Sequence, residues 1–423
     1  MLFKPNKGFT FVQMFEFRIM VKKIGLIAGL LLCTLSVFAQ KKNFSYQFYG
    51  QVRGDLFYNS RENGEIVDGL FHLYPKDHAY DADGNDLNAQ ANGSFYLLYS
   101  RLGLDLKGPS VGRFQTSAKL EVDFRGTSSS FTLFRMRHAY VQLSDEHSSL
   151  LVGQTWHPFF GDVFPEMLNL STGAPFNAFS RTPQIRYRYS NSAWRFTGTA
   201  LWQLQYLSTG PVGKSESYIK NSCVPEFHAG VDYIHDGLQL GAGAEMLSLK
   251  PRTQNVVDGK TYKIDERITS LSFEAHARYK TKDWNVSAKS TLGSNMTHTC
   301  MLGGYGVTSI DNRTGEQRYT PFRVSSTWLN VTHGQRWKQG LFLGYLKNMG
   351  TGKDIMAQYG TGLDVGQLLT ANVQLSYNLP HWKCGMEYSP STAWFGNADK
   401  RGKISDTHTV TNHRILWVLM YMF

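Results

Sequence analysis

Polar and apolar residues alternate strictly along much of this chain, in stretches of roughly ten residues. Between residues 194 and 206, Trp194, Phe196 and Trp202 share one parity, while Arg195 and Thr197 share the other. Successive side chains of a β-strand point to opposite faces, so a period of two predicts strands with one apolar and one polar face. Helical spacing is scarce, and we therefore predict an all-β protein.

Similar segments recur from residue 44 to the end of the chain, and each is long enough to form a strand. We expect about sixteen strands, near residues 44–57, 95–107, 113–126, 131–144, 148–157, 182–190, 193–207, 225–235, 238–249, 266–281, 283–293, 319–331, 334–348, 369–379, 381–390 and 411–423.

The connectors between these segments alternate in length. The short ones lie at 109–112, 191–192, 236–237, 282, 332–333 and 380, and the long ones at 58–94, 158–181, 208–224, 250–265, 294–318, 349–368 and 391–410, with 127–130 as an exception. Asp236-Gly237 is a strong hairpin signal. Tight turns at one end and long loops at the other are typical of an up-and-down transmembrane β-barrel. A secreted β-sandwich or solenoid is the alternative.

The last strand favours the membrane barrel. Its apolar face ends on an aromatic residue at the final position and consists of Ile415, Trp417, Leu419, Tyr421 and Phe423. A soluble edge strand with this face would invite aggregation, whereas in a barrel the face meets lipid. Phe423 also resembles the terminal signal by which outer-membrane barrels are recognised for insertion. Every backbone group in hydrocarbon must be paired, so we expect the last strand to close on the first.

A short apolar segment precedes the strands. It runs from Ile24 to Phe38 behind two lysines and ends at Ala39, which is the pattern of a cleavable secretory signal, and it is too short to span a membrane as a helix. We predict a signal peptide over 1–39, with a possible true start at Met20, and an outer-membrane β-barrel over 40–423. The predicted location is the bacterial outer membrane.

Composition agrees with this class of protein. Aromatic residues make up 14% of the chain and charged residues 18%, with 40 glycines, which excludes a disordered chain or a coiled coil. The formal charge of +11 falls to about +7 once the signal is removed, and the basic residues are dispersed, so we expect no nucleic-acid partner. Of the four cysteines, three remain after the predicted cleavage, and this odd, sparse set without CxxC spacing indicates no zinc site or disulfide framework, so we predict neither a metal nor a cofactor.

Four ordered motifs over about 60 residues carry a family resemblance. They are Ser100-Arg101-Leu102-Gly103-Leu104-Asp105-Leu106-Lys107, Lys119-Leu120-Glu121-Val122-Asp123-Phe124, Arg135-Met136-Arg137-His138-Ala139-Tyr140-Val141 and Leu151-Val152-Gly153-Gln154-Thr155-Trp156. With them the sequence resembles the DcaP-like trimeric outer-membrane porins. The resemblance implies a 16-stranded homotrimeric barrel that passes small, often anionic, solutes.

If the apolar faces meet lipid, the opposite faces line the lumen. The residues that we expect there are Arg53, Arg101, Lys119, Glu121, Asp123, Arg125, Arg186 and Arg188. Basic groups outnumber acidic ones, and arginine rings in a narrow passage favour anions, so weak anion selectivity is our hypothesis. Alternatively, these charges pair across the wall and only hydrate the lumen.

The phase of one strand is ambiguous. Arg135 and Arg137 share parity with Ala139 and Val141, which appear suited to lipid. Either a bulge shifts the phase or the strand begins later. His138 has the lumen parity, and a lone histidine there is more often hydrogen-bonded to the wall than a ligand.

The connector 158–181 is the third outward loop and is rich in aromatic residues and proline. Its apolar content suits burial, so we predict that it folds into the barrel as a constriction, although a packed surface loop would explain the aromatics too. Asp162 and Glu166 on this loop would then face Arg101, Arg125, Arg186 and Arg188 and set a transverse field.

Two weaker signals remain. The stretch Asp81 to Asp86 offers oxygen ligands for a cation such as calcium, but its glycine is misplaced for an EF-hand, and a solvated turn is the simpler interpretation. Cys223 and Cys300 fall in outward loops and could pair, whereas Cys384 has the lipid-facing parity.

A channel, an adhesin and an enzyme are the competing functions. Sixteen strands leave an aqueous lumen, and the polar inward faces argue against a closed barrel around an apolar ligand. A lipid-active enzyme would need a nucleophile with a histidine nearby on the outer wall, and we predict no enzyme. We expect an outer-membrane diffusion porin for small hydrophilic, anionic solutes, surrounded by outer-membrane lipid. A plugged barrel that acts as an adhesin or lipid-active enzyme is the alternative.

Overall fold

The computed structural model describes residues 44–66, 71–125, 133–169 and 173–423. Residues Tyr46–Phe423 form one compact unit. The predicted signal peptide lies outside the described residues.

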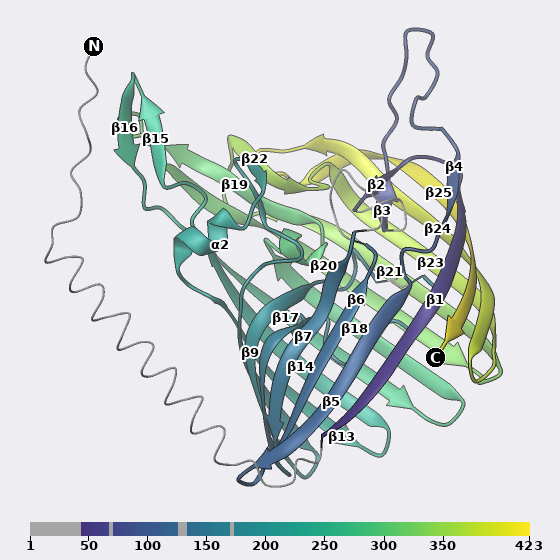
Figure 1. The fold of residues 1–423 in the computed structure, drawn as a ribbon. Coiled ribbons are helices and arrows are strands. Elements are labelled where there is room, and N and C mark those ends of the chain that lie inside the picture. Colours follow the sequence, from purple (N-terminus) through teal and green to yellow (C-terminus); the bar gives the residue numbers. More distant parts are fainter. Residues whose placement is uncertain (1–43, 67–70, 126–132, 170–172) are drawn as a thin grey trace, which may run out of the picture. The chain divides into compact units, whose positions relative to one another are not determined.

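Sixteen antiparallel strands form a barrel, as predicted, and they tilt relative to its axis (Figure 1). They are β1 (Ser45–Asn59), β5 (Arg101–Val111), β6 (Phe114–Asp123), β7 (Arg135–Ser144), β8 (Ser148–Trp156), β9 (Arg181–Asn191), β10 (Trp194–Leu201), β13 (Glu226–His235), β14 (Leu238–Leu249), β17 (Ile268–Lys280), β18 (Trp284–Ser294), β20 (Gln317–His333), β21 (Trp337–Thr351), β23 (Val365–Asn378), β24 (Trp382–Ala398) and β25 (Ile404–Met422).

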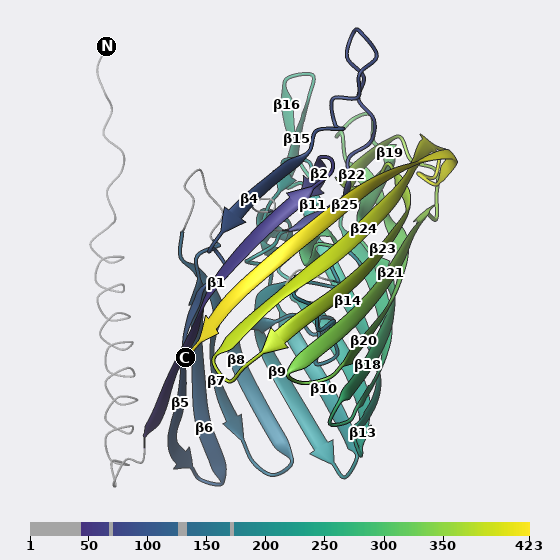
Figure 2. The ribbon, with the colours of Figure 1, turned by 90° about the vertical axis from the view of Figure 1, so that its right-hand side faces the viewer.

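The first and last strands close the barrel. β1 pairs with β25 in a register that places Val52 opposite Tyr421 and Asp55 opposite Val418, and its other edge pairs with β5. The terminal residue joins this seam, since the Gly50 amide donates to the Phe423 carbonyl at 2.9 Å. Figure 2 shows β25 in yellow alongside β1 in purple. The predicted pairing of strand sixteen with strand one is confirmed.

The two faces of each strand separate as the alternation predicts. Large apolar side chains cover the outside and are exposed in the isolated chain, among them Val52, Leu56, Ile185, Phe196, Leu271, Phe273, Leu343, Val373, Trp417 and Leu419. Inward positions carry polar side chains, which are buried beneath the loop segments that lie within the barrel. This arrangement hydrates the interior and presents hydrocarbon to lipid.

Aromatic rings form a partial belt on the outer face, near the tight turns of the strands between β10 and β25. Neighbouring rings contact one another across strands in the pairs Trp194 with Tyr233, Trp284 with His333, Trp337 with Tyr377, and Trp382 with Tyr421. Amphipathic rings are favoured at the level of lipid headgroups, so the belt marks one membrane interface. The tight turns therefore lie just beyond that interface.

Several predicted long loops contain further structure, which the alternation did not reveal. The additional elements are β2 (Asn63–Glu65), β3 (His72–Pro75), β4 (Asn92–Tyr96), β11 (Thr209–Gly210), β12 (Gly213–Lys214), α2 (Ser217–Ser222), β15 (Gln254–Val257), β16 (Lys260–Lys263), η1 (Thr297–Thr299), β19 (Gly303–Ile310) and β22 (Ala357–Thr361). None of the helices in the described part of the chain is long and apolar enough to span a membrane.

Two of the expected loops are mostly strand. The expected loop 391–410 is largely taken up by β24 and β25, and 349–368 contains β22, which pairs with β19. These segments carry no run of outward apolar residues of the kind that faces lipid, and their apolar residues Ala393, Phe395 and Val410 are buried instead. Conversely, β10 ends at Leu201, earlier than predicted, and Tyr206 is buried beside Phe71 and Phe179 rather than facing lipid.

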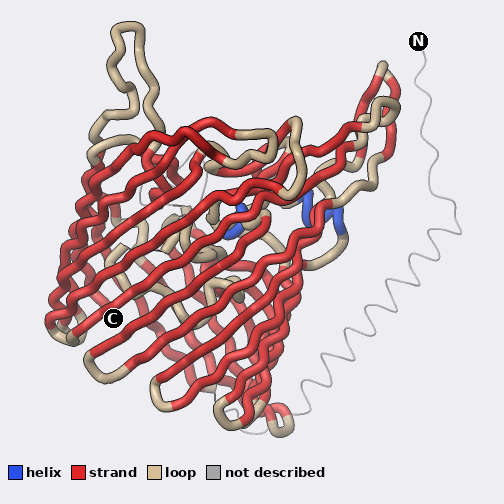
Figure 3. The backbone as a smooth tube through the Cα atoms, turned by 180° about the vertical axis from the view of Figure 1, so that it is seen from behind, coloured by secondary structure: helices blue, strands red, loops and turns tan. Residues whose placement is uncertain are grey.

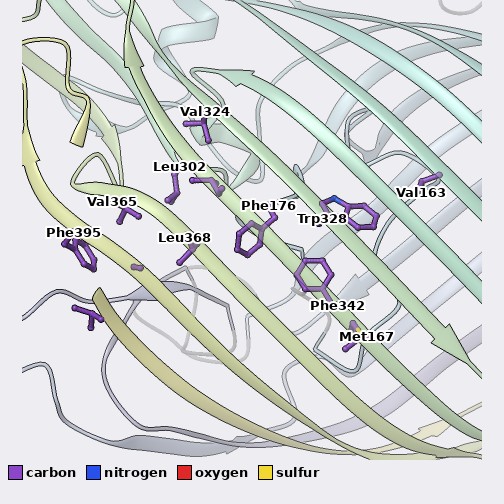
Figure 4. Packing of buried hydrophobic residues seen from close by; sticks show 13 residues of the cluster. Val163, Met167, Phe176, Leu302, Val324, Trp328, Phe342, Val365, Leu368 and Phe395 are labelled. Carbon is purple, nitrogen blue, oxygen red and sulfur yellow. The ribbon is translucent and has the colours of Figure 1, made fainter. Parts of the chain in front are cut away.

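The main hydrophobic cluster lies inside the barrel. Loop segments pass within the ring of strands in Figure 3. Phe176 from one such segment packs with Trp328 of β20 and with Phe342 of β21, whose ring centroid is 6.0 Å away (Figure 4). The cluster therefore fixes a loop to the inner wall.

Candidate functional site: a loop-constricted lumen

The loop between β8 and β9 crosses the lumen, as predicted; we call residues 157–180 the constriction loop, of which 170–172 lie outside the described residues. Its backbone is bound by inward side chains of the far wall. Gln374 Oε1 accepts from the Leu168 amide at 2.5 Å, and Asn330 Oδ1 accepts from the Glu166 amide at 2.9 Å. Arg53 donates to the Leu168 carbonyl at 2.6 Å. An ordinary surface loop would not make these contacts.

Two wall glycines make room for this crossing. A Cβ at Gly344 would lie 2.7 Å from the Phe176 ring, and one at Gly385 would lie 2.8 Å from the Leu168 side chain. Both distances are too short for real side chains. The absence of a side chain at these inward positions therefore lets the constriction loop pack directly on β21 and β24.

A cavity of about 400 Å³ lies beside the constriction loop, lined by residues of β5 to β9 and, on another part of the wall, by residues of β21, β23 and β24. Basic side chains dominate its lining. The basic residues are Arg101, Arg125, Arg135, Arg137, Arg181, Lys338 and Lys383, and the acidic ones are Glu121 and Glu166. Aromatic rings of Tyr99, Trp156, Phe160, Phe164 and Phe179 complete it.

A bulge resolves the ambiguous phase of β7. Glu121 pairs with His138 in register, but Val122 pairs with Met136, so the pairing shifts by one residue at Arg137. As a result Arg137 points inward and contacts Glu121 at 2.5 Å and the buried Asp123 at 2.9 Å.

The same bulge brings further groups to the lumen. Arg135 contacts Asp123 at 2.5 Å, so two guanidinium groups share one buried carboxylate. His138 is also buried, with Nδ1 3.0 Å from the hydroxyl of Thr155, as expected of a wall residue. A bulge inserts one residue into a strand, which is why neighbours can face the same side.

Arginines and aromatic rings stack around the cavity. Arg125 donates to the Tyr99 hydroxyl and lies over its ring at 4.4 Å. Arg181 lies 4.2 Å above the Trp156 ring, and the same ring stacks on Phe160 with a centroid distance of 3.9 Å. The three side-chain nitrogens of Arg181 donate no hydrogen bond to any residue that the structure describes. Its charge is thus held by stacking rather than by a carboxylate contact at hydrogen-bond distance.

The two loop carboxylates face different walls, which differs from the predicted single field. Asp162 contacts Arg195 at 2.8 Å and Arg188 at 3.5 Å, in a small compartment that Arg186 also lines. Of the four arginines predicted to face the loop carboxylates, Arg186 and Arg188 lie in this compartment. Arg101 and Arg125 line the larger cavity instead, and Asp162 contacts Arg195, which was not predicted. The physical reason is the path of the loop, because the part around Asp162 contacts Arg188 of β9, Arg195 of β10 and Arg278 of β17.

Glu166 lies at the far side of the crossing. It contacts Lys338 of β21 at 2.6 Å and lines the larger cavity together with Arg101 and Arg125. Burial raises the pKa of the Glu166 carboxyl, but the bond and charge of Lys338 outweigh it, so the pKa lies below its usual value. The loop therefore brings an ionised carboxylate opposite the arginine-rich wall.

Other predicted wall charges do not line the larger cavity. Arg53 forms a buried ion pair with Asp55 at 2.7 Å, and Lys119 contacts Asp105 at 2.7 Å and the Tyr49 hydroxyl at 3.0 Å. Pairing within the wall describes these groups well. The alternative of charges that pair across the wall therefore holds for part of the predicted set.

Sequence reasoning missed three basic residues of the cavity. Lys338 and Lys383 have the inward parity of their strands, so the alternation could have identified them. Arg181 begins β9, but the prediction assigned it to the end of a loop. Its inward direction depends on packing against Trp156, for which the sequence carries no signal.

The structure shows a turn at the suggested cation site, and it shows no disulfide between the suggested cysteines. Asp81 Oδ1 accepts from the amides of Asp83 and Asn85, which forms a turn, and Asp86 contacts Arg61 at 3.1 Å. The cysteines at 223, 300 and 384 are free, so the suggested pairing of the first two does not occur. Cys384 is exposed on the outer face, as its parity predicted.

One sequence pattern matches a hydrolase motif but lies in a different structural context. Residues 108–112 spell Gly-Pro-Ser-Val-Gly, which matches the GxSxG letters of hydrolase nucleophiles. In those enzymes the serine lies on a strand-to-helix turn, whereas Ser110 is exposed near the hairpin turn between β5 and β6. The structural context of a nucleophile is therefore lacking at this position.

Together, the closed barrel, its apolar outer face and its loop-narrowed polar lumen define a bacterial outer-membrane β-barrel of the porin type. Comparisons with solved structures agree on the fold. OmpT, an outer-membrane protein of Vibrio cholerae, has a TM-score of 0.54 at 13% identity, covering 90% of this chain and 98% of that one. OmpF of Salmonella typhi in complex with daunomycin has a TM-score of 0.50 at 10% identity, covering 89% and 97%.

No protein-family model and no curated protein matches this chain. The resemblance to DcaP-like porins therefore rests on the four motifs alone, while the outer-membrane barrel fold rests on the structure.

Proposed function

We propose that this protein is a diffusion porin that passes small hydrophilic solutes and favours anions. The observation that carries the proposal is the excess of arginine and lysine over carboxylates around the 400 Å³ cavity beside the constriction loop. Positive groups in a narrow passage with low-dielectric walls raise the local concentration of anions and disfavour cations.

The individual contacts support net positive potential in the cavity. Glu121 and Asp123 each form an ion pair with an arginine, and Glu166 forms one with Lys338. The negative charge of each carboxylate is therefore neutralised by a neighbouring basic group. Arg181 contributes a charge that stacks on Trp156 without a described hydrogen-bond partner. We assign Arg101, Arg125 and Lys383 to the same anion-attracting cavity lining.

The test is the reversal potential of the purified mature chain in a planar bilayer under a salt gradient. We expect discrete channels that favour chloride over potassium. Arg101→Gln and Lys383→Gln should each lower the chloride preference, because each removes one positive charge from the cavity lining. Arg113→Gln is the matched control, since Arg113 is exposed at a tight turn and contacts Asp145.

Three outcomes would contradict the proposal. A cation-selective wild type would remove the role of the arginine wall while leaving a pore. Equal effects of Arg101→Gln and Arg113→Gln would move the selectivity away from the cavity. A folded barrel without conductance would overturn the open channel itself.

We also propose that the functional unit is a homotrimer in outer-membrane lipid. Support comes from a structure of Vibrio cholerae OmpT in a trimer form, which has a TM-score of 0.53 to this chain at 13% identity. Light scattering on the detergent-solubilised protein should give three chains per particle, and channels should open in groups of three. A monodisperse single chain would contradict this assembly.

A further inference from the structure

Two histidines and two glutamates lie close together where the constriction loop begins, next to β13, β14 and η1. His157 begins that loop directly after β8, Glu226 begins β13, Glu245 lies on β14, and His298 lies in η1. The four side chains are at most 1% exposed. Their potential ligand atoms all lie within 4.8 Å of one another. Residues from four separate parts of the chain thus converge on one point.

The spacing of these atoms fits a small metal ion. His157 Nε2 lies 3.1 Å from Glu226 Oε1 and 3.4 Å from Glu245 Oε2, and His298 Nε2 lies 3.0 Å from Glu226 Oε1. Four ligands about 2.0–2.1 Å from a tetrahedral Zn²⁺ would be about 3.3 Å apart. The side chains therefore need only small adjustments to surround an ion.

The carboxylates also leave acceptor atoms unsatisfied. Glu226 Oε2 and Glu245 Oε2 are buried and receive no hydrogen bond from any residue that the structure describes. Two carboxylates close together in a water-poor site repel each other unless a proton or a cation lies between them. A divalent ion held by two carboxylates and two neutral imidazoles gives a group of zero net charge.

The histidine tautomers follow from this arrangement. Binding through Nε2 requires each imidazole to carry its proton on Nδ1. His298 Nδ1 is buried without a hydrogen-bond partner among the described residues, so a proton there displaces no donor. His157 Nδ1 accepts from the Phe159 amide at 3.2 Å, and this contact would break on metal binding.

We propose that His157, Glu226, Glu245 and His298 form a structural site for one Zn²⁺-type divalent ion. A mixed nitrogen and oxygen ligand set suits Zn²⁺ better than Mg²⁺ or Ca²⁺, which prefer oxygen alone. Four protein ligands fill a tetrahedral ion, so the site holds structure and performs no chemistry. This site is independent of the proposed anion preference.

The position of the site indicates what it stabilises. The two ends of the constriction loop meet here, because the His157 amide donates to the Ser180 carbonyl at 3.0 Å. The Phe179 amide donates to the Thr299 carbonyl at 2.7 Å, which joins the loop to η1. An ion bound by His157 and His298 would therefore fasten the loop and η1 to β13 and β14.

The test is metal binding by the refolded full-length mature chain after treatment with EDTA. We expect one Zn²⁺ per chain by elemental analysis, retained in excess Mg²⁺, and a Co²⁺ derivative with the visible absorption of tetrahedral coordination. His298→Gln and Glu245→Gln should weaken Zn²⁺ binding by more than about tenfold, since even the loss of an outer-shell partner costs that much. His138→Gln, which changes another buried lumen histidine, is the matched control and should bind as the wild type does.

Three results would overturn the site. They are no Zn²⁺ retained by the folded wild type, equal binding by the wild type and His298→Gln, or an equal loss in His138→Gln. If the variants fail to fold, the wild type decides alone: Zn²⁺ should raise its unfolding temperature and give the tetrahedral Co²⁺ spectrum. Absence of both would mean that Glu226 and Glu245 share a proton instead.

Discussion

Replacement of Phe176 by alanine should loosen the constriction loop without unfolding the barrel. Phe176 is 2% exposed and packs against Trp328 and Phe342 on the inner wall. A buried aromatic side chain covers roughly 150–250 Å². At about 25 cal/mol per Å² the whole side chain would contribute about 4–6 kcal/mol. Because alanine keeps the Cβ, and because measured Phe→Ala substitutions cost about 3–5 kcal/mol, we expect a loss of about 3–5 kcal/mol. The hydrophobic effect operates here because the lumen is aqueous, unlike the lipid-facing wall.

The loop has other attachments, so we expect a changed position rather than a lost fold. Ser326 still donates to the Phe176 carbonyl at 2.8 Å, and Lys338 still contacts Glu166. The free energy of unfolding, measured by urea titration in a fixed detergent, should fall by the stated amount. Single-channel current should become noisier and larger on average, since the loop samples positions away from the wall.

Phe164→Ala is the matched control on the same loop. Its side chain is 40% exposed, so its loss should cost less than about 1 kcal/mol. Equal unfolding free energies and equal current noise in the two variants would refute the reasoning that burial of Phe176 fixes the loop.

Three further predictions concern the loops and one strand. Burial raises the pKa of Asp86, but hydrogen bonds from neighbouring histidine, arginine and backbone groups outweigh it and hold the pKa well below its usual range. The ionised carboxylate therefore stabilises its loop above about pH 4, and the protection of that loop's amides, measured relative to the intrinsic exchange rate at each pH, should fall as the pH drops further; constant protection would contradict this. Burial raises the pKa of Cys300 to about 12, so a charged thiol reagent should label exposed Cys223 and label Cys300 only after unfolding; rapid native labelling of both would be inconsistent. Gly153 has a φ of +133°, and a Cβ there would lie 2.3 Å from a backbone oxygen of the neighbouring strand, so Gly153→Ala should cost about 1–3 kcal/mol in urea unfolding. Gly198→Ala, with open space at the Cβ position, should be nearly neutral, and equal losses would argue against strain.

The alternation identified all sixteen barrel strands, because each lipid-facing strand must carry an apolar face of period two. The alternation did not predict where some strands end, and the reason is again physical. The hairpin that β24 and β25 extend lacks the outward apolar run that marks a lipid-facing strand, and its apolar residues Ala393, Phe395 and Val410 pack into a buried cluster instead. The early end of β10 at Leu201 was hidden for a related reason, since Tyr206 is apolar enough for lipid but packs inside.

The candidate site was only partly predictable. Parity placed Arg101 and Arg125 in the lumen, and it could have placed Lys338 and Lys383 there as well. It left the facing of Arg137 undecided between a bulge and a later strand start, because a bulge depends on pairing with the next strand rather than on local sequence, and the structure shows the bulge.

The four ligands of the proposed metal site show the same limit most clearly. Residues 157, 226, 245 and 298 have no spacing that a motif could detect, and only closure of the barrel brings them together. The sequence by itself determined the strands, their two faces and the charge available to the lumen, because these follow from local periodicity. The tertiary structure decided which charges meet, since the path of the constriction loop depends on packing at distant places such as Phe176 on Gly344.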